Sequence, residues 1–310
     1  MQGPIEQKIN NRYKIIKMKF LQLTTILLLS ILIISCYKED KIESELGKPR
    51  HEIEFKDNPV DKYIYEEYTK TGVAILYNFS ELDYKWNLTS SSLSQYILKL
   101  QENREILGHG VKYLDKILNS HYDQNFKTKY FPLNILLCDS LTIVDRKNND
   151  PVTTGRNYIL IGQIGNSLKN KTAQELTVLK GIINGELWGY TIYLNGLMTF
   201  PTDFFAPCEE MYGLKIGSRT ENPDFDSKKL GFWVQDPSTS SSYTYIAPRK
   251  EGDISQFIEM ITSHSDQEIM SKMEGYPILY NKYIILTNYF KSEYGLDLQA
   301  IGNNKPTVIL

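Results

Sequence analysis

TAQELTVLKGIINGELWGYTIYL, residues 172–194, is the stretch that decides the fold of this chain. Its periodic positions follow the 3.6-residue repeat of an amphipathic helix; they are Leu176, Leu179, Ile182, Ile183, Leu187, Tyr190 and Thr191. Gly181, Gly185 and Gly189 lie inside the same stretch. Each glycine costs a helix roughly 1 kcal/mol relative to alanine. A helix that keeps these glycines must have some other need for them.

On both sides of this helix the sequence carries strand and helix patterns. β-Branched and aromatic runs predict strands at residues 73–79, 131–138 and 158–162. Helical spacing predicts helices at residues 57–70, with Asp57 as its cap, and at 93–118, 253–263, 266–274 and 277–294. Helices at both ends with strands between them predict an α+β fold, in which a mixed sheet packs against a long central helix and the C-terminal part is helical.

Residues 199–250 separate the central helix from the C-terminal helices and are rich in Pro, Gly, Ser and Asp. This composition is typical of a functional loop or of an insertion over a cleft.

The N-terminus has the pattern of a secretory signal. Basic residues precede an apolar run, LQLTTILLLSILII at residues 21–34, which is too short to span a bilayer comfortably. The run ends in Ile33-Ile34-Ser35-Cys36, which resembles the bacterial lipobox, where the cysteine is acylated and becomes the new N-terminus. We therefore expect a signal peptide at residues 1–35 and lipidation of Cys36, with palmitate among the attached acyl chains. A plain N-terminal anchor helix is the alternative, and Met18 is an alternative start.

The residues after Cys36 predict where the lipid places the protein. Lys38, rather than aspartate, follows at the second position, so nothing asks for retention at the inner membrane and an outer-membrane lipoprotein is expected. Tyr37-Lys38-Glu39-Asp40 also resembles the lysine-plus-acidic tag that some Gram-negative bacteria use for export to the cell surface; a solvated tether is the other interpretation. Residues 36–56 predict a flexible tether and residues 57–310 a single domain.

Charge and cysteine usage narrow the function classes. With 35 basic and 37 acidic residues the net charge is −2, and no basic stripe follows the chain, so a nucleic-acid partner is not expected. Cys138 ends an apolar run and Cys208 lies in the 199–250 region; we favour two free, inert thiols over a disulfide.

Four segments together resemble the substrate-import-associated zinc metallohydrolase lipoproteins, a zinc metallopeptidase family. They are FKDNPVDKYIYEEYTK at 55–70, the 172–194 helix, DISQFIEMI at 253–261 and YNKYIILTNYFKSEYGLDL at 280–298. The resemblance implies a zincin-like domain with a HExxH helix. It also implies a lipoprotein that is encoded beside SusC/SusD-type, TonB-dependent import systems.

The resemblance also shows what this chain has lost. In HExxH, two histidines one helical turn apart bind zinc, and the glutamate polarises the zinc-bound water. The matching pentad here is GELWG, residues 185–189, so Gly185 and Gly189 replace both histidines and Glu186 alone keeps its type, as a vestigial general base. In DISQFIEMI, Ser255 matches the expected third ligand and Glu259 is the acid one turn later. No metal ligand set survives, and we expect no bound zinc.

Three function hypotheses follow. The first is a catalytically inactive binding or accessory subunit of a nutrient-import complex, with Glu186, Trp188, Glu259 and the 199–250 region holding a peptide or glycan. The second is an active metallopeptidase with an unorthodox zinc site, built from Glu186, Glu259, His264 and an aspartate, although such an oxygen-rich set binds zinc poorly. The third is a purely structural lipoprotein that contacts the transporter.

Overall fold

The computed structural model describes residues 51–85, 96–144, 148–233 and 243–307, together with 17–19 and 22. The chain divides into two compact units, Met1–Glu52 and Ile53–Leu310. Within the described residues no helix combines the length and the apolar character needed to cross a bilayer. The second unit carries the sheet and the helices discussed below.

A mixed sheet lies at one side of the second unit, in the order β1-β3-β6-β5. Its strands are β1 (Ala74–Leu76), β3 (Asn134–Leu137), β6 (Tyr158–Ile161) and β5 (Val152–Thr154). The first three run parallel, with Ile75 opposite Ile135 and Leu136 opposite Leu160, and β5 is antiparallel to β6.

Both faces of this sheet are buried, and successive side chains enter different cores. Ile135 and Leu137 join the main core, whereas Leu136 and Cys138 join a second cluster on the opposite face. The second cluster packs against the antiparallel pair β2 (Tyr96–Lys99) and β4 (Ser140–Ile143). Burial on both faces explains why these strands read as continuous apolar runs rather than alternating ones.

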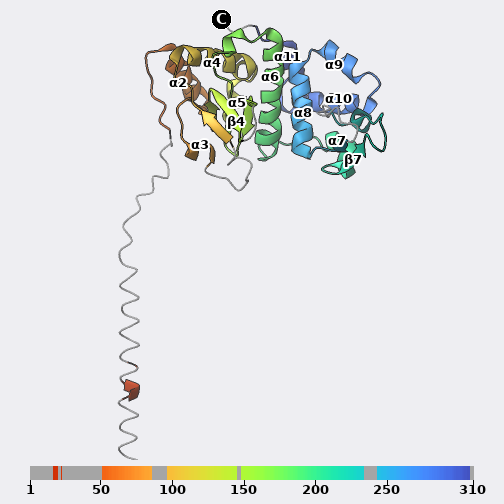
Figure 1. The fold of residues 1–310 in the computed structure, drawn as a ribbon, viewed down its shortest axis with the longest axis horizontal. Helices are drawn as coiled ribbons and strands as arrows, with labels where there is room; N and C mark the ends of the chain where they lie inside the picture. The colour runs from red at the N-terminus through yellow and green to blue at the C-terminus, as the bar shows by residue number, and fades with distance from the viewer. Residues whose placement is uncertain are drawn as a thin grey trace, which may run out of the picture. The chain divides into compact units, whose positions relative to one another are not determined.

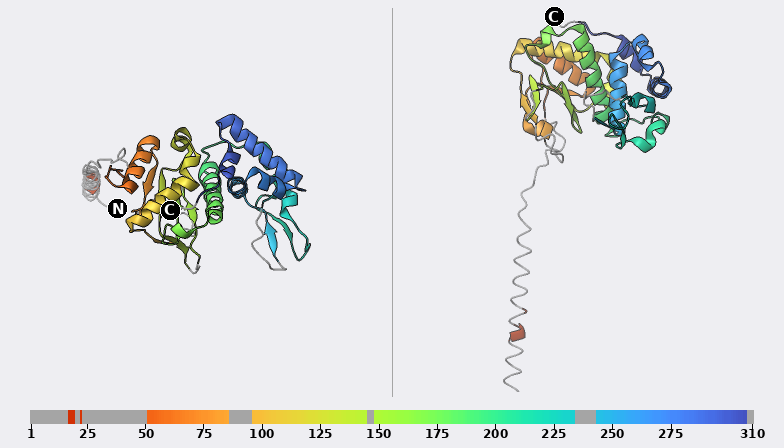
Figure 2. Two further views of the ribbon diagram at one scale, coloured as in Figure 1. Left: turned by 90° about the horizontal axis from the view of Figure 1, so that it is seen from above. Right: turned by 45° about the vertical axis from the view of Figure 1, so that its right-hand side comes forward.

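Helices cover the sheet and build the rest of the unit (Figures 1 and 2). On the sheet side they are α2 (Pro59–Thr71), α3 (Glu81–Lys85), α4 (Arg104–Ile117) and α5 (Gln124–Tyr130). α6 (Ala173–Glu186) and α8 (Lys250–Ser263) lie side by side in the middle, and α9 (Asp266–Met273), α10 (Pro277–Tyr294) and α11 (Leu298–Asn303) follow them. The predicted α+β class, with a mixed sheet and helices at both ends, is confirmed.

Two local predictions are corrected. Residues 96–99 form β2 rather than part of a helix from 93, because α4 begins only at Arg104, where the Asn103 side chain accepts from the Glu105 and Ile106 N–H groups. Residues 93–95 lie outside the described part. The cap of α2 is Asn58 rather than Asp57.

The 172–194 helix also departs from regularity. Thr172 opens it with a capping box to Glu175, as an α-helix that ends at Glu186. The chain then continues as a π-helix, η4, over Leu187–Tyr193. Such i→i+5 segments are rare and tend to mark unusual sites inside helices.

The 199–250 region is more ordered than its composition predicts. It contains α7 (Thr202–Phe205), the 3₁₀ turns η5 (Ala206–Met211) and η6 (Ser227–Leu230), and the pair β7 (Lys215–Ser218) and β8 (Thr244–Ile246). Cys208, Phe232 and Ala247 form a small core of its own. Residues 234–242 lie outside the described part.

Candidate functional site

The pentad that matches HExxH lies at the junction between α6 and η4, where the two faces of the helix differ sharply. Gly185 and Gly189 are spaced one turn apart, with Gly181 a further turn before them. This glycine stripe faces α8, which runs beside α6. The pattern predicted from sequence therefore has a partner, and the partner is the helix that carries Ser255 and Glu259.

The two helices approach so closely that no side chain fits between them at the glycine positions. A Cβ atom on Gly185 would lie 2.6 Å from the Ser255 carbonyl oxygen, and one on Gly189 would lie 2.4 Å from that of Glu251. A Cβ on Gly181 would lie 2.7 Å from the Glu259 carbonyl oxygen. We call this contact the α6–α8 seam. The seam explains why this helix keeps three glycines despite their cost in helix stability. Without side chains at these positions, the backbones of α6 and α8 can pack directly against each other.

The seam also tests whether zinc fits here. The residues at the two histidine positions have no side chain, and the carbonyls of α8 occupy the space where an imidazole would begin. Ser255, at the position of the third ligand, is buried, and its Cβ would lie only 2.8 Å from a Cβ added to Gly189. The positions that sequence matched as ligands are brought together, but they form a packing contact rather than a coordination site. Zinc does not fit these residues.

Elsewhere in the described ranges no group of three or more His, Cys, Asp or Glu side chains is placed to hold a metal ion. His264, proposed for an unorthodox site, is the C-cap of α8, and its Nδ1 lies 3.0 Å from the Met260 carbonyl oxygen and 2.9 Å from Ser263 Oγ. His109 lies on α4, and His121 follows shortly after the end of that helix. Desolvation by burial lowers the pKa of His121 to about 4. None of these three histidines belongs to such a group among the described residues.

Glu186 and Glu259 lie on opposite sides of the seam, both half-buried. Burial raises the pKa of Glu186 to about 7, and the nearby Glu259 carboxylate adds to the shift. One turn further on, burial and the charges of Glu186 and Glu251 raise the pKa of Tyr190. Glu186 is thus a carboxyl group with a pKa near neutral pH, where it can both release and take up a proton.

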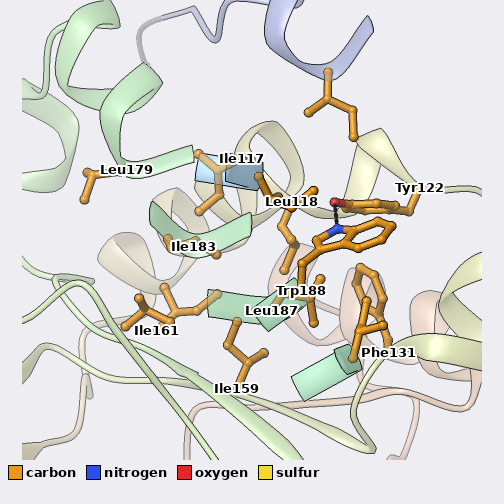
Figure 3. Close-up of a cluster of buried hydrophobic side chains, with 14 of the residues drawn as sticks. Ile117, Leu118, Tyr122, Phe131, Ile159, Ile161, Leu179, Ile183, Leu187 and Trp188 are labelled. Atoms are coloured by element: carbon orange, nitrogen blue, oxygen red, sulfur yellow. Dashed lines mark hydrogen bonds between the residues drawn. The ribbon is translucent and has the colours of Figure 1, made fainter. Parts of the chain in front are cut away.

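Trp188 lies in the core and not in a cleft. It is 0% exposed, and its indole N–H donates to the Tyr122 hydroxyl at 2.8 Å (Figure 3). The ring packs edge-on against Phe290 and lies 5.6 Å from the ring of Phe126. This position is incompatible with direct contact between Trp188 and a ligand in solvent, so the expected role as a cleft residue is wrong.

Sequence reasoning missed a buried ion pair that joins the 199–250 region to α8 and α10. Lys282 Nζ and Asp253 Oδ2 are 2.6 Å apart and both side chains are fully buried. Lys282 also donates to the Gly231 carbonyl oxygen and lies 4.4 Å from the centre of the Phe204 ring. Asp253 and Lys282 are 29 residues apart, and no motif relates such positions.

Cys138 and Cys208 are free and buried, as favoured from sequence. Burial raises the pKa of the Cys138 thiol to about 12 and raises that of Cys208. A thiol that is buried and protonated is a poor nucleophile, which agrees with an inert role.

No protein-family model and no curated protein sequence matches this chain. Among solved structures, the chain is similar to the 2.10 Å crystal structure of a "putative zinc-binding metallo-peptidase" from Bacteroides caccae ATCC 43185, with a TM-score of 0.52 and 14% sequence identity. The match covers 79% of this chain and 89% of that one. This chain has a metallopeptidase-like fold. At this identity the likeness extends to the fold alone, so the activity named for the neighbour is not transferred with it.

Proposed function

We propose that this protein is a non-catalytic lipoprotein with a metallopeptidase-like fold, which acts as a binding or accessory component of a SusC/SusD-type, TonB-dependent nutrient importer. In this proposal the lipid on Cys36 holds it at the outer membrane, exposed at the cell surface. The N-terminal sequence and the family resemblance support the location and the partner. The fold and the seam support the rest.

The observation that carries the proposal is the α6–α8 seam. In a zinc peptidase the space beside the HExxH helix must admit a metal, a water molecule and a substrate. Here the matching positions, Gly185 and Gly189, contact the backbone of α8, and adding even a Cβ would force α8 to move. In this proposal Gly185 and Gly189 have a structural role, which is to let the two helices pack together. Glu186 keeps its side chain, but its neighbours cannot place a metal-bound water before it.

The first test is the metal content of the full chain, purified in detergent without chelators and dialysed against trace zinc, measured by elemental analysis. We expect well under one zinc per chain, with no difference between the wild type and Glu186→Gln. Near-stoichiometric zinc that is lost in Glu186→Gln or Glu259→Gln would instead establish the unorthodox metallopeptidase.

The second test concerns the partner. The tagged lipoprotein is solubilised from its native outer membrane and co-purifying proteins are identified. Recovery of a SusC/SusD-type pair in amounts comparable to the bait is expected, whereas a bait that purifies alone would remove the importer from the proposal.

A further inference from the structure

A cavity of about 300 Å³ opens between α5 and the C-terminal end of α10. It is lined by Asp123, Asn125, Phe126, Lys129, Tyr130, Glu293, Tyr294, Gly295 and Leu296. We call it the α5–α10 pocket. Its size is at the lower end of the range for small-ligand sites, which suits a single ring rather than an extended chain.

The inner wall of the pocket is aromatic and rigid. Phe126 is buried and its ring lies 5.0 Å from that of Tyr130, while Tyr130 and Tyr294 meet edge to face at 6.0 Å. Tyr294 is fixed in turn, because its hydroxyl lies 3.1 Å from Thr199 Oγ1. Half-buried tyrosines of this kind offer an apolar surface that costs little conformational entropy when a ligand binds.

The rim is polar, exposed and unoccupied by the protein's own hydrogen bonds. Asn125, Lys129 and Glu293 make no side-chain hydrogen bond to any described residue, and Asp123 uses one carboxylate oxygen to cap α5 at Phe126 N–H. The groups left for a ligand are the Glu293 carboxylate, the second carboxylate oxygen of Asp123, an amide and an ammonium. They therefore present acceptors and donors together around an aromatic wall.

The charges on the rim bear on the class of ligand. With two carboxylates and one ammonium, the rim repels an anion, and a cation must share the rim with Lys129. A neutral molecule with several hydroxyl groups matches all of the rim groups, because each hydroxyl both donates and accepts while the ring's C–H face packs on tyrosine. We propose that the α5–α10 pocket binds one ring of a neutral sugar. This inference rests on the proposed function, because it names the class of ligand that the proposed binding subunit would hold.

Trp188 provides a reporter for this pocket. It does not line the cavity, but its ring lies 5.6 Å from Phe126, which does. A ligand that presses on Phe126 will change the electronic environment of the buried indole. The chain has three tryptophans, so 5-fluorotryptophan labelling gives a simple ¹⁹F NMR spectrum in which Trp188 is assigned by elimination with Trp86→Phe and Trp233→Phe.

The experiment titrates the labelled full chain, in detergent, with trilysine as a charged probe and with malto-, cello-, manno- and xylo-oligosaccharides, each to about 10 mM. We expect at least one to shift the Trp188 resonance in a saturable way. The variant Asn125→Ala/Glu293→Ala should weaken that sugar at least tenfold, since it removes exposed rim groups without touching the aromatic wall. The matched control, Gln267→Ala/Glu274→Ala, removes an exposed amide on α9 and an exposed carboxylate at its C-terminal end, and it should bind like the wild type.

Three outcomes would overturn the inference: no shift with any of the four sugars, a shift that survives in Asn125→Ala/Glu293→Ala, or a saturable shift only with a basic peptide such as trilysine. In each of these cases the proposed function can still be tested independently of the pocket. Co-purification with the importer tests the accessory role whether or not the pocket binds sugar, and failure of both would show that the protein is neither.

Discussion

At the scale of single residues, three glycines that lower the stability of an isolated helix are required for the close approach of α6 and α8 at the seam. Gly185 is the sharpest case because the atom that a Cβ would meet, the Ser255 carbonyl oxygen at 2.6 Å, belongs to a backbone rather than to a flexible side chain. Overpacking of this kind costs typically about 1–3 kcal/mol. The gain in helix propensity from alanine offsets only part of it.

We therefore expect Gly185→Ala to lower the free energy of unfolding by about 2 kcal/mol, measured by urea denaturation. Gly108→Ala is the matched control. Gly108 also lies inside a helix, α4, but its nearest neighbour to a new Cβ is a Val60 methyl at 3.9 Å, an ordinary contact. That variant should gain roughly 0.5–1 kcal/mol. Equal effects in the two variants would mean that the seam opens without cost.

Glu186 predicts a pH dependence of stability. Its pKa is raised from 4.5 to about 7 by burial, with Glu259 adding to the shift. Between these values the folded protein holds a proton that the unfolded chain releases, so the free energy of unfolding falls as the pH rises and the full cost is present above pH 7. Below pH 4.5 the group contributes nothing, because both states are protonated.

Glu186→Gln should remove this decline and be more stable than the wild type by about 2 kcal/mol near pH 8, with little difference near pH 4. Urea midpoints of both proteins across this range supply the measurement. Glu66→Gln, at an exposed position on α2, is the control and should follow the wild type. A wild type and Glu186→Gln that run parallel across the whole range would show that Glu186 is not desolvated.

At the scale of elements, the buried pair Lys282–Asp253 ties α10 and α8 to the 199–250 region. Removing one partner of a buried pair leaves an uncompensated charge and costs about 3–5 kcal/mol, far more than the pair itself contributes. Lys282→Met should lose about that much and expose the 199–250 region to proteases. Lys291→Met on the same helix breaks an exposed pair with Asp297 and should cost under about 1 kcal/mol.

A second variant tests whether the loss of stability in Lys282→Met comes from the unpaired charge of Asp253. Lys282→Met/Asp253→Asn removes both charges, and it should recover part of the stability that Lys282→Met alone loses. Protease resistance and urea midpoints of the three variants decide the matter. Recovery would be missing if Lys282 acted only through its contact with Phe204.

How far the sequence predicts these elements depends on where the deciding contact lies. Helix α10 (Pro277–Tyr294) is predicted to the residue, because Pro277 and Gly295 mark its ends locally. The helix expected from residue 93 is too long, because the apolar spacing of 96–99 suits a strand as well as a helix and only its pairing with β4 settles which forms. The π-helix that follows Glu186 carries no sequence signature that we could use.

The same distinction applies to the site. The absence of histidines at positions 185 and 189 is visible in the sequence, and so is the match of Ser255 to a third ligand. That these positions touch one another as a seam is not visible, since it depends on the distance between two helices that are far apart in the sequence. The burial of Trp188 was missed for a similar reason: the aromatic residues that enclose it come from α5 and α10.

At the scale of the whole molecule, the fold does not by itself determine the chemistry. The match to the solved metallopeptidase-like structure covers 79% of this chain, and the positions that the sequence matched to HExxH lie in a packing contact. A fold can persist in this way because its stability comes from the core and from helix packing, to which a catalytic site contributes little.

The N-terminal sequence predicts where this molecule resides. If Cys36 is acylated, Cys36→Ser should lose incorporation of an alkyne-palmitate label and leave the membrane fraction, since one or more acyl chains are the only anchor that the N-terminal pattern supplies after cleavage. If residues 37–40 act as the proposed export tag, the variant Lys38→Ala/Glu39→Ala/Asp40→Ala should stay labelled and membrane-bound but become resistant to protease added to intact cells. Wild-type protein that is digested in intact cells, together with a protected but lipidated tag variant, would place the domain at the surface. Protection of both proteins would place it on the periplasmic face, and a membrane-bound, unlabelled Cys36→Ser protein would show that residues 21–34 remain as an anchor helix.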